Sequence, residues 1–423
     1  MHSLRLPLSL LGFAIVCVLA ACSGGELQGS EGDGGAFDAT ATESGDDSAG
    51  GDGGVEAGNE ATAEAGTDAT MPPDAGTDAT GDVASDGDAD APVYVYPDAG
   101  ADCGIGPNAE PLDLACTGLY SDFTNKVVAP GVEPFAPGYV FWSDGALKSR
   151  WIALPAGQKI DTSSMDDWTF PVNTRIWKEF SLVLGGIPTR VETRLLWKQA
   201  PGVWYRTTYR WSADGTTSAT ELTSGEMNVA GTTYEIPSQL ECADCHGGRP
   251  SGVLGFEAMA LSAPAATGLT MAQLVSQNLV TTPPTGSVTI PGDPTAQAAL
   301  GWLHINCGVA CHNDTGGLAS ATNFWMRLNV GSLSSVQTTD TYTTGWNVPD
   351  QGYPIPGATK TYRFHACDVP ESAAYYRADL RNGVNGTPPG TQMPPIVTHV
   401  VDNTDVAALA AWINEGCGDA GKD

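Results

Sequence analysis

Two short motifs place a histidine directly behind a close pair of cysteines, and any fold of this chain has to be arranged around them. The first motif reads CADCH and spans residues 242–246, and the second reads CGVACH and spans residues 307–312. The cysteines are separated by two residues in the first motif and by three in the second. Because the same residue types recur in the same order, one chemical explanation should account for both motifs.

The first motif has the C-x-x-C-H form that is typical of covalent haem attachment. Two thiols that add to the two vinyl groups of a haem must lie close together. The next residue then lies beneath the ring, where its imidazole can bind the iron. We therefore predict that Cys242 and Cys245 attach a c-type haem and that His246 is its proximal ligand.

The second motif has a slightly wider loop, which can still reach both vinyl groups. Cys307 and Cys311 are predicted to attach a second covalent haem, with His312 as its proximal ligand. The alternatives are a zinc site, a redox-active cysteine pair and plain disulfides. The spacings lack the symmetry of a zinc ribbon, and the other two alternatives leave both histidines as coincidences.

The chain begins with the features of an export signal. Arg5 precedes an apolar run that ends at Ala21 and is too short to span a bilayer. The run closes with LAAC, which resembles the cleavage site of bacterial lipoproteins. We expect residues 1–21 to be a signal peptide and Cys22 to carry a lipid, and Ser23 favours an outer-membrane lipoprotein that faces the periplasm or the cell surface. The alternative is an ordinary signal peptide cut before an incidental Cys22.

Residues 22–102 have the composition of a linker rather than of a folded domain. From residue 23 to residue 102 there are 20 acidic residues and no lysine or arginine. Such a segment cannot bury enough apolar surface to offset its chain entropy, so we predict a disordered acidic linker. Of the formal net charge of −30, this segment contributes −20 and Arg5 contributes +1, which leaves −11 for residues 103–423. No basic patch supports nucleic-acid binding.

Four further cysteines remain, and in an oxidising compartment an even number favours disulfides. The most economical pairing joins Cys103 to Cys116 and Cys367 to Cys417. The sequence alone also allows other connectivities.

Residues 103–250 have the pattern of a β domain that ends in the first motif. Runs rich in aromatic and β-branched residues are separated by turns that contain glycine or proline. This spacing predicts an antiparallel all-β fold, either a sandwich or a barrel. The runs are YVFWSDG (139–145), SRWIALP (149–155), TRIWKEFSLVLGG (174–186), TRVETRLLWKQ (189–199) and GVWYRTTYRWSADG (202–215).

Residues 290–419 have a helical pattern and are predicted to form an all-α domain. Asp293 followed by Pro294 is typical of a helix start, and a second helix is expected after Asp402 or Asn403. The apolar face of the second helix comprises Val406, Leu409, Trp412 and Ile413, with Gly416 as its stop. Residues 251–289 are expected to be a connector with one short helix near residues 271–277.

Met393 precedes two prolines and lies 81 residues after His312. The order of helix, Cys–Cys–His, loop, Met-Pro-Pro and closing helix resembles class I cytochrome c. This resemblance implies that Met393 binds the second haem iron opposite His312, which raises the reduction potential.

The sixth ligand of the first haem has no such signal. His304 lies in the helix that leads to the second motif and is a candidate, although it can equally be an ordinary helix histidine. An open sixth position is a further alternative. The other candidates are His365, His399, Met259 and Met271.

From about residue 112 to residue 415, the chain resembles a family of bacterial di-haem c-type cytochromes with an N-terminal β region. This resemblance implies haem at both motifs and no settled substrate. The three-residue gap of the second motif departs from the usual two-residue gap. The matching stretches are FWSDGALKSRWIALPAGQKI (141–160), WTFPVNTRIWKEF (168–180), VETRLLWK (191–198), YEIPSQLECADCHGG (234–248), VLGFEAMALS (253–262), LGWLHINCGVACHN (300–313) and QMPP (392–395).

Our leading hypothesis is a lipid-anchored cytochrome with two covalently bound haems that transfers electrons between redox partner proteins in the cell envelope. It is expected to be an electron carrier rather than an enzyme. One alternative is a di-haem peroxidase or oxidoreductase, which needs an open site on the first haem. Another is a β domain that binds a carbohydrate or a partner protein, with an accessory cytochrome.

Overall fold

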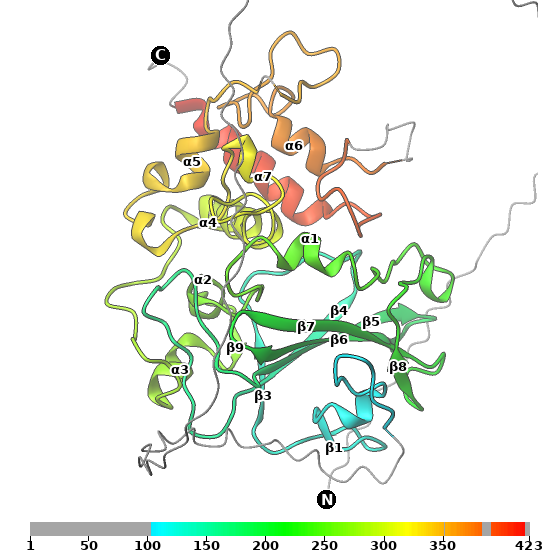
Figure 1. Cartoon of the computed structure of the whole chain (residues 1–423). Helices are drawn as coiled ribbons and strands as arrows, with labels where there is room; N and C mark the ends of the chain where they lie inside the picture. Colours follow the sequence, from blue (N-terminus) through cyan, green and yellow to red (C-terminus); the bar gives the residue numbers. More distant parts are fainter. Residues whose placement is uncertain (1–102, 351, 383–390, 419–423) are drawn as a thin grey trace, which may run out of the picture. The chain divides into compact units, whose positions relative to one another are not determined.

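The structure is a computed structural model that describes residues 103–350, 352–382 and 391–418. The predictions for the signal peptide, for lipid attachment at Cys22 and for the acidic linker lie outside the described residues. The described residues belong to one unit, Ser85–Asp423, in which a β-sheet is followed along the chain by a region with several short helices (Figure 1).

Seven strands form one antiparallel sheet, and two more form a separate ribbon. The strands are β1 Tyr120–Asp122, β2 Val127–Val128, β3 Val132–Ala136, β4 Leu147–Ala153, β5 Arg175–Leu184, β6 Ile187–Ala200, β7 Val203–Trp211, β8 Ala219–Glu221 and β9 Thr267–Gly268. Their order across the sheet is β8-β7-β6-β5-β4-β3-β9. The expected antiparallel β region is thus confirmed. In the described part of the chain the edge strands β8 and β9 are not paired with each other, so the sheet is open.

Strands β4 to β7 coincide with four of the runs that the sequence predicts as strands. The turn between β5 and β6 contains Gly185 and Gly186, whose φ angles are 57° and 86°. Glycine adopts such angles at no steric cost because it lacks a Cβ.

Residues 139–145 form a loop, so the prediction of a strand there is wrong. The reason is that its polar groups bond to the helical region. Asn306 accepts the Trp142 backbone N–H at 2.7 Å and donates to the Val140 carbonyl at 2.9 Å. The Trp142 indole donates to the carbonyl of Val400 at 2.7 Å. Backbone groups that are satisfied in this way do not require a neighbouring strand.

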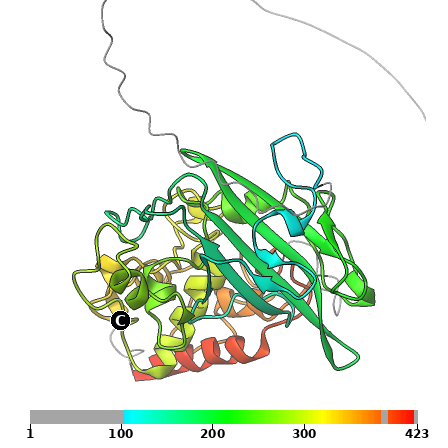
Figure 2. The same cartoon turned by 90° about the horizontal axis from the view of Figure 1, so that it is seen from below.

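One face of the sheet is covered by the first segment of the described chain. Figure 2 shows this segment, coloured cyan, across the long strands on the side away from α7, which is coloured red and spans Asn403–Glu415. The segment contributes Leu114, Leu119 and Tyr120 to a hydrophobic cluster that also holds Trp177 and Trp211 of the sheet. Most of the aromatic side chains on this face are therefore core residues.

The other face of the sheet packs against the helical region. The largest hydrophobic cluster contains Ile152, Ile176 and Leu196 from three adjacent strands and continues into the helices through Leu300 and Leu409. The expected connector is part of this structure, since it supplies the edge strand β9. The proposed boundaries between separate domains stay a prediction.

Most of the helices are short, and the two longer ones lie at the start and at the end of the helical region. They are α1 Cys242–His246, α2 Ala258–Ser262, α3 Met271–Ser276, α4 Pro294–Leu303, α5 Asp340–Gly345, α6 Ala373–Ala378 and α7 Asn403–Glu415. Short 3-10 turns span Leu114–Cys116, Val229–Gly231, Ser320–Thr322, Val330–Ser332, Val336–Thr338 and Gly416–Gly418. Helix α3 is the short helix expected in the connector.

The two helices predicted from their caps are confirmed. The Asp293 carboxylate accepts the Ala296 N–H at 3.0 Å where α4 begins, and Asp402 accepts the Asp405 N–H at 3.3 Å where α7 begins. Asp402 also accepts the Trp302 indole N–H at 3.1 Å, so the cap of α7 is bonded to α4.

The apolar face of α7 is the one that the sequence predicts, and all four of its residues are buried: Val406, Leu409, Trp412 and Ile413. The helix ends at Glu415, as expected. Gly416 has a φ of −65°, so it is not a left-handed stop. A Cβ on Gly416 would lie 2.4 Å from the Trp346 ring, so limited space explains the glycine.

Two disulfides join Cys103 to Cys116 and Cys367 to Cys417, which confirms the economical pairing. Their Cα atoms are 5.9 Å and 4.6 Å apart, respectively. Within the ranges that the structure describes, we find no helix with the length and apolar character needed to cross a membrane.

We predict that Leu409→Ala lowers the free energy of unfolding by about 2–5 kcal/mol, because Leu409 is fully buried in α7. Urea unfolding followed by circular dichroism measures the loss. Asn414→Ala, on the exposed side of the same helix, serves as a control and should change the value by less than about 0.5 kcal/mol. Equal effects of the two substitutions would contradict the packing described here.

Candidate haem-attachment sites

The two motifs lie in different local structures. The first motif is itself the short helix α1, and the following Gly247 N–H donates to the Ala243 carbonyl at 2.7 Å, in the usual four-residue pattern. The second motif begins in a π-helical turn, His304–Gly308, that continues α4.

The wider gap of the second motif matches this widened turn. The His312 N–H donates to the Cys307 carbonyl at 2.8 Å, and the Val309 N–H donates to the His304 carbonyl at 2.9 Å. Both bonds span five residues, as in a π-helix. The additional residue between the two cysteines is therefore accommodated as a bulge of the helix.

Both motif histidines are held in the same way. The Nδ1 of His246 lies 2.6 Å from the Gly252 carbonyl oxygen, and the Nδ1 of His312 lies 2.9 Å from the Phe324 carbonyl oxygen. Since a carbonyl only accepts, each Nδ1 carries the proton and donates it. The Nε2 atom then has a free lone pair, which is the arrangement of a metal-binding imidazole oriented by its other nitrogen.

The surroundings keep both imidazoles neutral. Burial is the main reason that the pKa of His246 falls to about 3, and the nearby Arg206 and Lys178 lower it further. Burial also lowers the pKa of His312. A neutral imidazole is the form that binds a metal.

The four motif cysteines are free thiols, whereas the other four described cysteines form the two disulfides. Burial raises the pKa of Cys307 and that of Cys311 to about 12. Within the described residues, the only group of three or more potential ligand atoms that converges within 4.8 Å is elsewhere, at His365, Asp368 and Glu371. The four thiols are thus paired neither as disulfides nor as a zinc site, which leaves them available for thioether bonds.

The structure brings the two motifs together. A Cβ on Gly248, two residues after His246, would lie 2.2 Å from the carbonyl oxygen of Ala310, inside the second motif. The Thr315 hydroxyl donates to the Gly248 carbonyl at 3.1 Å. The absence of a side chain at Gly248 therefore lets the backbones of the two sites touch.

A buried ionic network connects the chain around both sites. Glu257 pairs with Arg249, which follows the first motif, and with His304, which precedes the second. Arg249 and Arg327 also both pair with Asp167, at 3.5 Å and 3.1 Å. Charged groups this deeply buried are stable only when they are paired.

His304 is occupied by this network. Its Nε2 donates to Glu257 at 2.8 Å, and its Nδ1 accepts the Leu328 N–H at 2.9 Å. Both ring nitrogens therefore have protein partners, which argues against His304 as an iron ligand.

Met393 lies in a loop before α7 that is fixed by Gln392. The Gln392 amide donates to the carbonyls of Pro394 and Thr398 at 2.8 Å and 2.9 Å, and its oxygen accepts the Asn382 N–H at 2.7 Å. The Met393 N–H donates to the Arg377 carbonyl at 2.9 Å. Nothing among these contacts engages the thioether.

Three of the other candidates for a sixth ligand have clear structural roles. Met259 and Met271 are buried in the main hydrophobic cluster. His399 bonds through Nε2 to Glu235 at 2.8 Å, and its backbone N–H donates to Asp144. The two bonds of His399 connect the helical region to loops of the β region.

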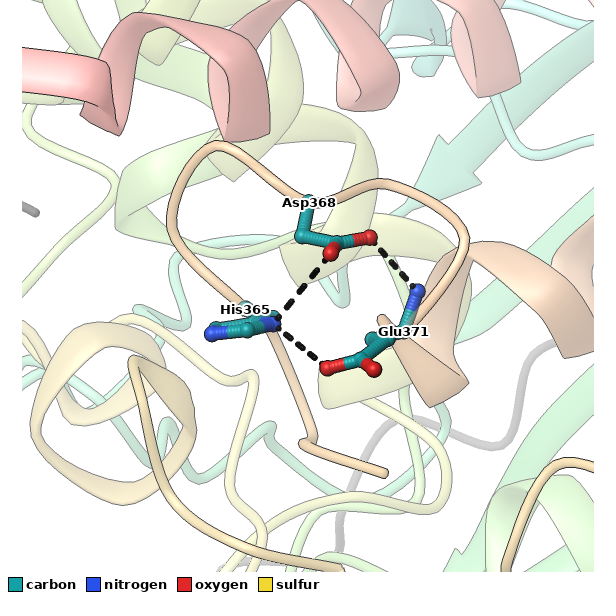
Figure 3. Close-up of side chains that lie close together, drawn as sticks. All are labelled: His365, Asp368 and Glu371. Atoms are coloured by element: carbon teal, nitrogen blue, oxygen red, sulfur yellow. Dashed lines mark hydrogen bonds and ion pairs between the residues drawn. The ribbon is translucent and has the colours of Figure 1, made fainter. Parts of the chain in front are cut away.

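His365 faces two carboxylates, as Figure 3 shows. Its Nδ1 lies 3.1 Å from Glu371 Oε2 and 3.9 Å from Asp368 Oδ2. The ring also stacks on Tyr362, with centroids 4.1 Å apart. The partly exposed ion pairs account for this arrangement without a ligand.

Sequence reasoning missed a group of cations on the sheet face that points toward the first motif: Arg150, Lys178, Arg194 and Arg206. In the sequence, such a cation is visible as a charged residue inside an apolar strand run, as Lys178 is in RIWKEF (175–180). A cavity of about 390 Å³ is lined instead by residues around β3, β4 and Gln277–Leu279, and none of its lining residues belongs to a motif.

We predict that Glu257→Gln lowers the free energy of unfolding by about 3–5 kcal/mol at pH 7, because it leaves Arg249 and His304 without their carboxylate. Burial alone would raise the pKa of Glu257, but Arg249 and His304 outweigh it and hold that pKa well below the ordinary value. A carboxylate with a lowered folded-state pKa contributes stability above its unfolded pKa, about 4.3, and loses it as the pH falls.

The difference between the wild type and Glu257→Gln should therefore narrow below about pH 4, as measured by unfolding at a series of pH values. Glu133→Gln, at an exposed carboxylate, is the control. A difference that stays constant from pH 7 to pH 3 would refute the ionic role of Glu257.

The residues themselves fit a covalently attached haem at each motif, since each offers two unpaired thiols and an imidazole with a free Nε2. No family model, curated protein or solved structure matches this chain.

Proposed function

We propose that this protein is a di-haem c-type cytochrome that carries electrons in the bacterial cell envelope. The observation that supports this best is the paired design of the two motifs. In both, free thiols adjoin a histidine whose Nδ1 is bonded to a backbone carbonyl. A chance occurrence of one C-x-x-C-H sequence would not explain the same side-chain arrangement at the second motif.

In this proposal, Cys242 and Cys245 hold the first haem and Cys307 and Cys311 hold the second. The haem supplies reversible one-electron chemistry at its iron. The protein fixes the imidazoles of His246 and His312 in one tautomer and one orientation, and it keeps them neutral by burial.

The contact between the motifs supports a relay between two adjacent centres. The backbones meet at Gly248 and Ala310, so groups attached at the two motifs would be neighbours. An electron that enters at one centre could then leave from the other to a redox partner protein, without a mobile carrier inside the molecule.

We further assign residues 290–419 to a class I cytochrome c-like fold. Helix α4 leads into the second motif, α7 closes the region against α4, and the Met393 loop precedes α7. In this assignment, Met393 would supply a thioether to the iron of the second haem, which His312 would also bind.

The two disulfides support an oxidising, extracytoplasmic location. Together with the expected lipid on Cys22, they favour an outer-membrane lipoprotein in which residues 22–102 separate the anchor from the cytochrome.

The mass of the full-length protein, made in a host that matures c-type cytochromes, should correspond to two covalent haems. Cys307→Ala/Cys311→Ala should remove one haem and retain the other, because the first motif keeps its own thiols. Cys367→Ser/Cys417→Ser, which removes a disulfide instead, should retain both. A colourless protein whose mass corresponds to the polypeptide without haem would contradict the proposal.

Met393→Ala should lower the midpoint potential of one haem and abolish the thioether-to-iron charge-transfer absorption, because thioether ligation favours ferrous iron. Potentiometric titration and absorption spectra of the oxidised protein measure the two effects. Met227→Ala, at a side chain that is 57% exposed, is the matched control. If both variants keep the wild-type potential and spectrum, another residue is the ligand.

A further inference from the structure

Three cations occupy directly opposed positions on three adjacent strands. Arg150 of β4 pairs with Lys178 of β5, and Lys178 pairs with Arg194 of β6. Because paired residues in a sheet point to the same face, these three side chains form one line, here called the cation row. Arg206 of β7 lies on the same face, opposite Leu196.

The cation row is shielded from water. Arg150 is only 9% exposed, and Lys178, Arg194 and Arg206 are half-buried. The row lies between two hydrophobic clusters on this face, one containing Ile152 and Ile176 and the other centred on Phe180. Like charges directly opposite one another are destabilising even on a solvated sheet.

Only one of these cations has a carboxylate partner. Arg194 makes two hydrogen bonds to Glu192, at 2.7 Å and 2.8 Å. Among the described residues, no carboxylate is paired with Arg150, Lys178 or Arg206. The Nε of Arg206 is buried with no hydrogen-bond partner.

Aromatic contacts replace a carboxylate only in part. The Lys178 ammonium lies 4.8 Å from the centroid of the Phe141 ring and 4.9 Å from that of Phe180. Burial, and then Arg150, lower the pKa of Lys178 well below its ordinary value. Three basic side chains that lack a carboxylate, next to a single Arg194–Glu192 pair, are therefore incomplete in the protein alone.

The row adjoins the first motif. A Cβ on Gly252 would lie 2.5 Å from Nη2 of Arg206, and the carbonyl of Gly252 is the acceptor for His246. Burial raises the pKa of Cys242 and that of Cys245, and nearby cations oppose this shift only in part: Arg194 at both thiols, Arg206 at Cys242 and Lys178 at Cys245. The cations that lack a carboxylate thus lie near the segment that would hold the first haem.

We propose that the cation row and Arg206 bind carboxylate groups, and that these are the two propionates of the haem attached at the first motif. The inference rests on the proposed function. Neighbouring strands are about 4.8 Å apart, so the row extends over about 10 Å and can face two carboxylates at once. Bound carboxylates supply negative charge to the row and can accept from the unpartnered Nε of Arg206.

The test compares Lys178→Gln with Lys159→Gln in the haem-loaded, full-length protein. Both substitutions replace a lysine by a glutamine, but Lys159 is exposed and its side chain bonds to Asn278, away from the row. In Lys178→Gln, the midpoint potential of the first haem should fall, because a nearby positive charge that favours ferrous iron is lost. The propionate bending band in the resonance Raman spectrum should shift. Lys159→Gln should leave both unchanged.

Mass spectrometry separates this inference from the proposed function. Lys178→Gln should keep two haems, since all four cysteines remain. Two haems with an unchanged potential and an unchanged Raman band would overturn the propionate assignment and leave the proposed function intact. A wild-type protein without haem would contradict both the propionate assignment and the proposed function. If Lys178→Gln does not fold, Arg150→Gln tests the same row with the same expected shifts.

A free carboxylate is the other source of the required anion. Sodium acetate, compared with sodium chloride at equal ionic strength, should not raise the unfolding temperature of the haem-loaded wild type, because the propionates already occupy the row. Stabilisation by acetate that is lost in Lys178→Gln and kept in Lys159→Gln would assign the row to a free carboxylate instead.

Discussion

The pairing of one buried carboxylate with two partners holds the candidate sites in place. Glu257 binds Arg249 from the segment after the first motif and His304 from the turn that opens the second. Each motif contains only five or six residues, so it cannot fix its own position in the fold. The shared carboxylate requires both segments to adopt one arrangement. It also explains why His304, which from sequence alone is a candidate ligand, has both nitrogens engaged within the protein.

Much of the local structure could be predicted because its causes are local. Asp293 and Asp402 begin helices because a carboxylate accepts a nearby backbone N–H, and the strands β4 to β7 follow from apolar runs with glycine turns. The loop at residues 139–145 could not be predicted, because its partner Asn306 is far away in the sequence. Strand propensity carries no information about such a partner. The same limit applies to the layout of the sheet, because strand propensity does not tell whether the edge strands β8 and β9 pair with each other.

For the candidate sites, the residues could be predicted from the sequence but their hydrogen bonding could not. The cysteines and histidines of both motifs are visible in the sequence because they stand next to one another, in the order that haem attachment would require. The bonding of His246 to Gly252 and of His312 to Phe324 depends on how loops return to the motif, which no spacing rule encodes. The cation row needs the strand register as well, since Arg150, Lys178 and Arg194 are far apart in sequence and become neighbours only in the sheet.

The loop at residues 139–145 has a consequence for motion. Domains of one chain usually move relative to one another unless a large apolar interface joins them. Here two hydrogen bonds join the β region to the helical region, one between Trp142 and Asn306 and one between His399 and Glu235. The largest hydrophobic cluster also continues from the sheet into the helices. These contacts, all between described residues, oppose a hinge motion of the two regions. In the proposed cytochrome, the spacing between the two haems would then be set by the fold rather than sampled by fluctuation, so the rate of electron transfer between them should vary little with solvent viscosity.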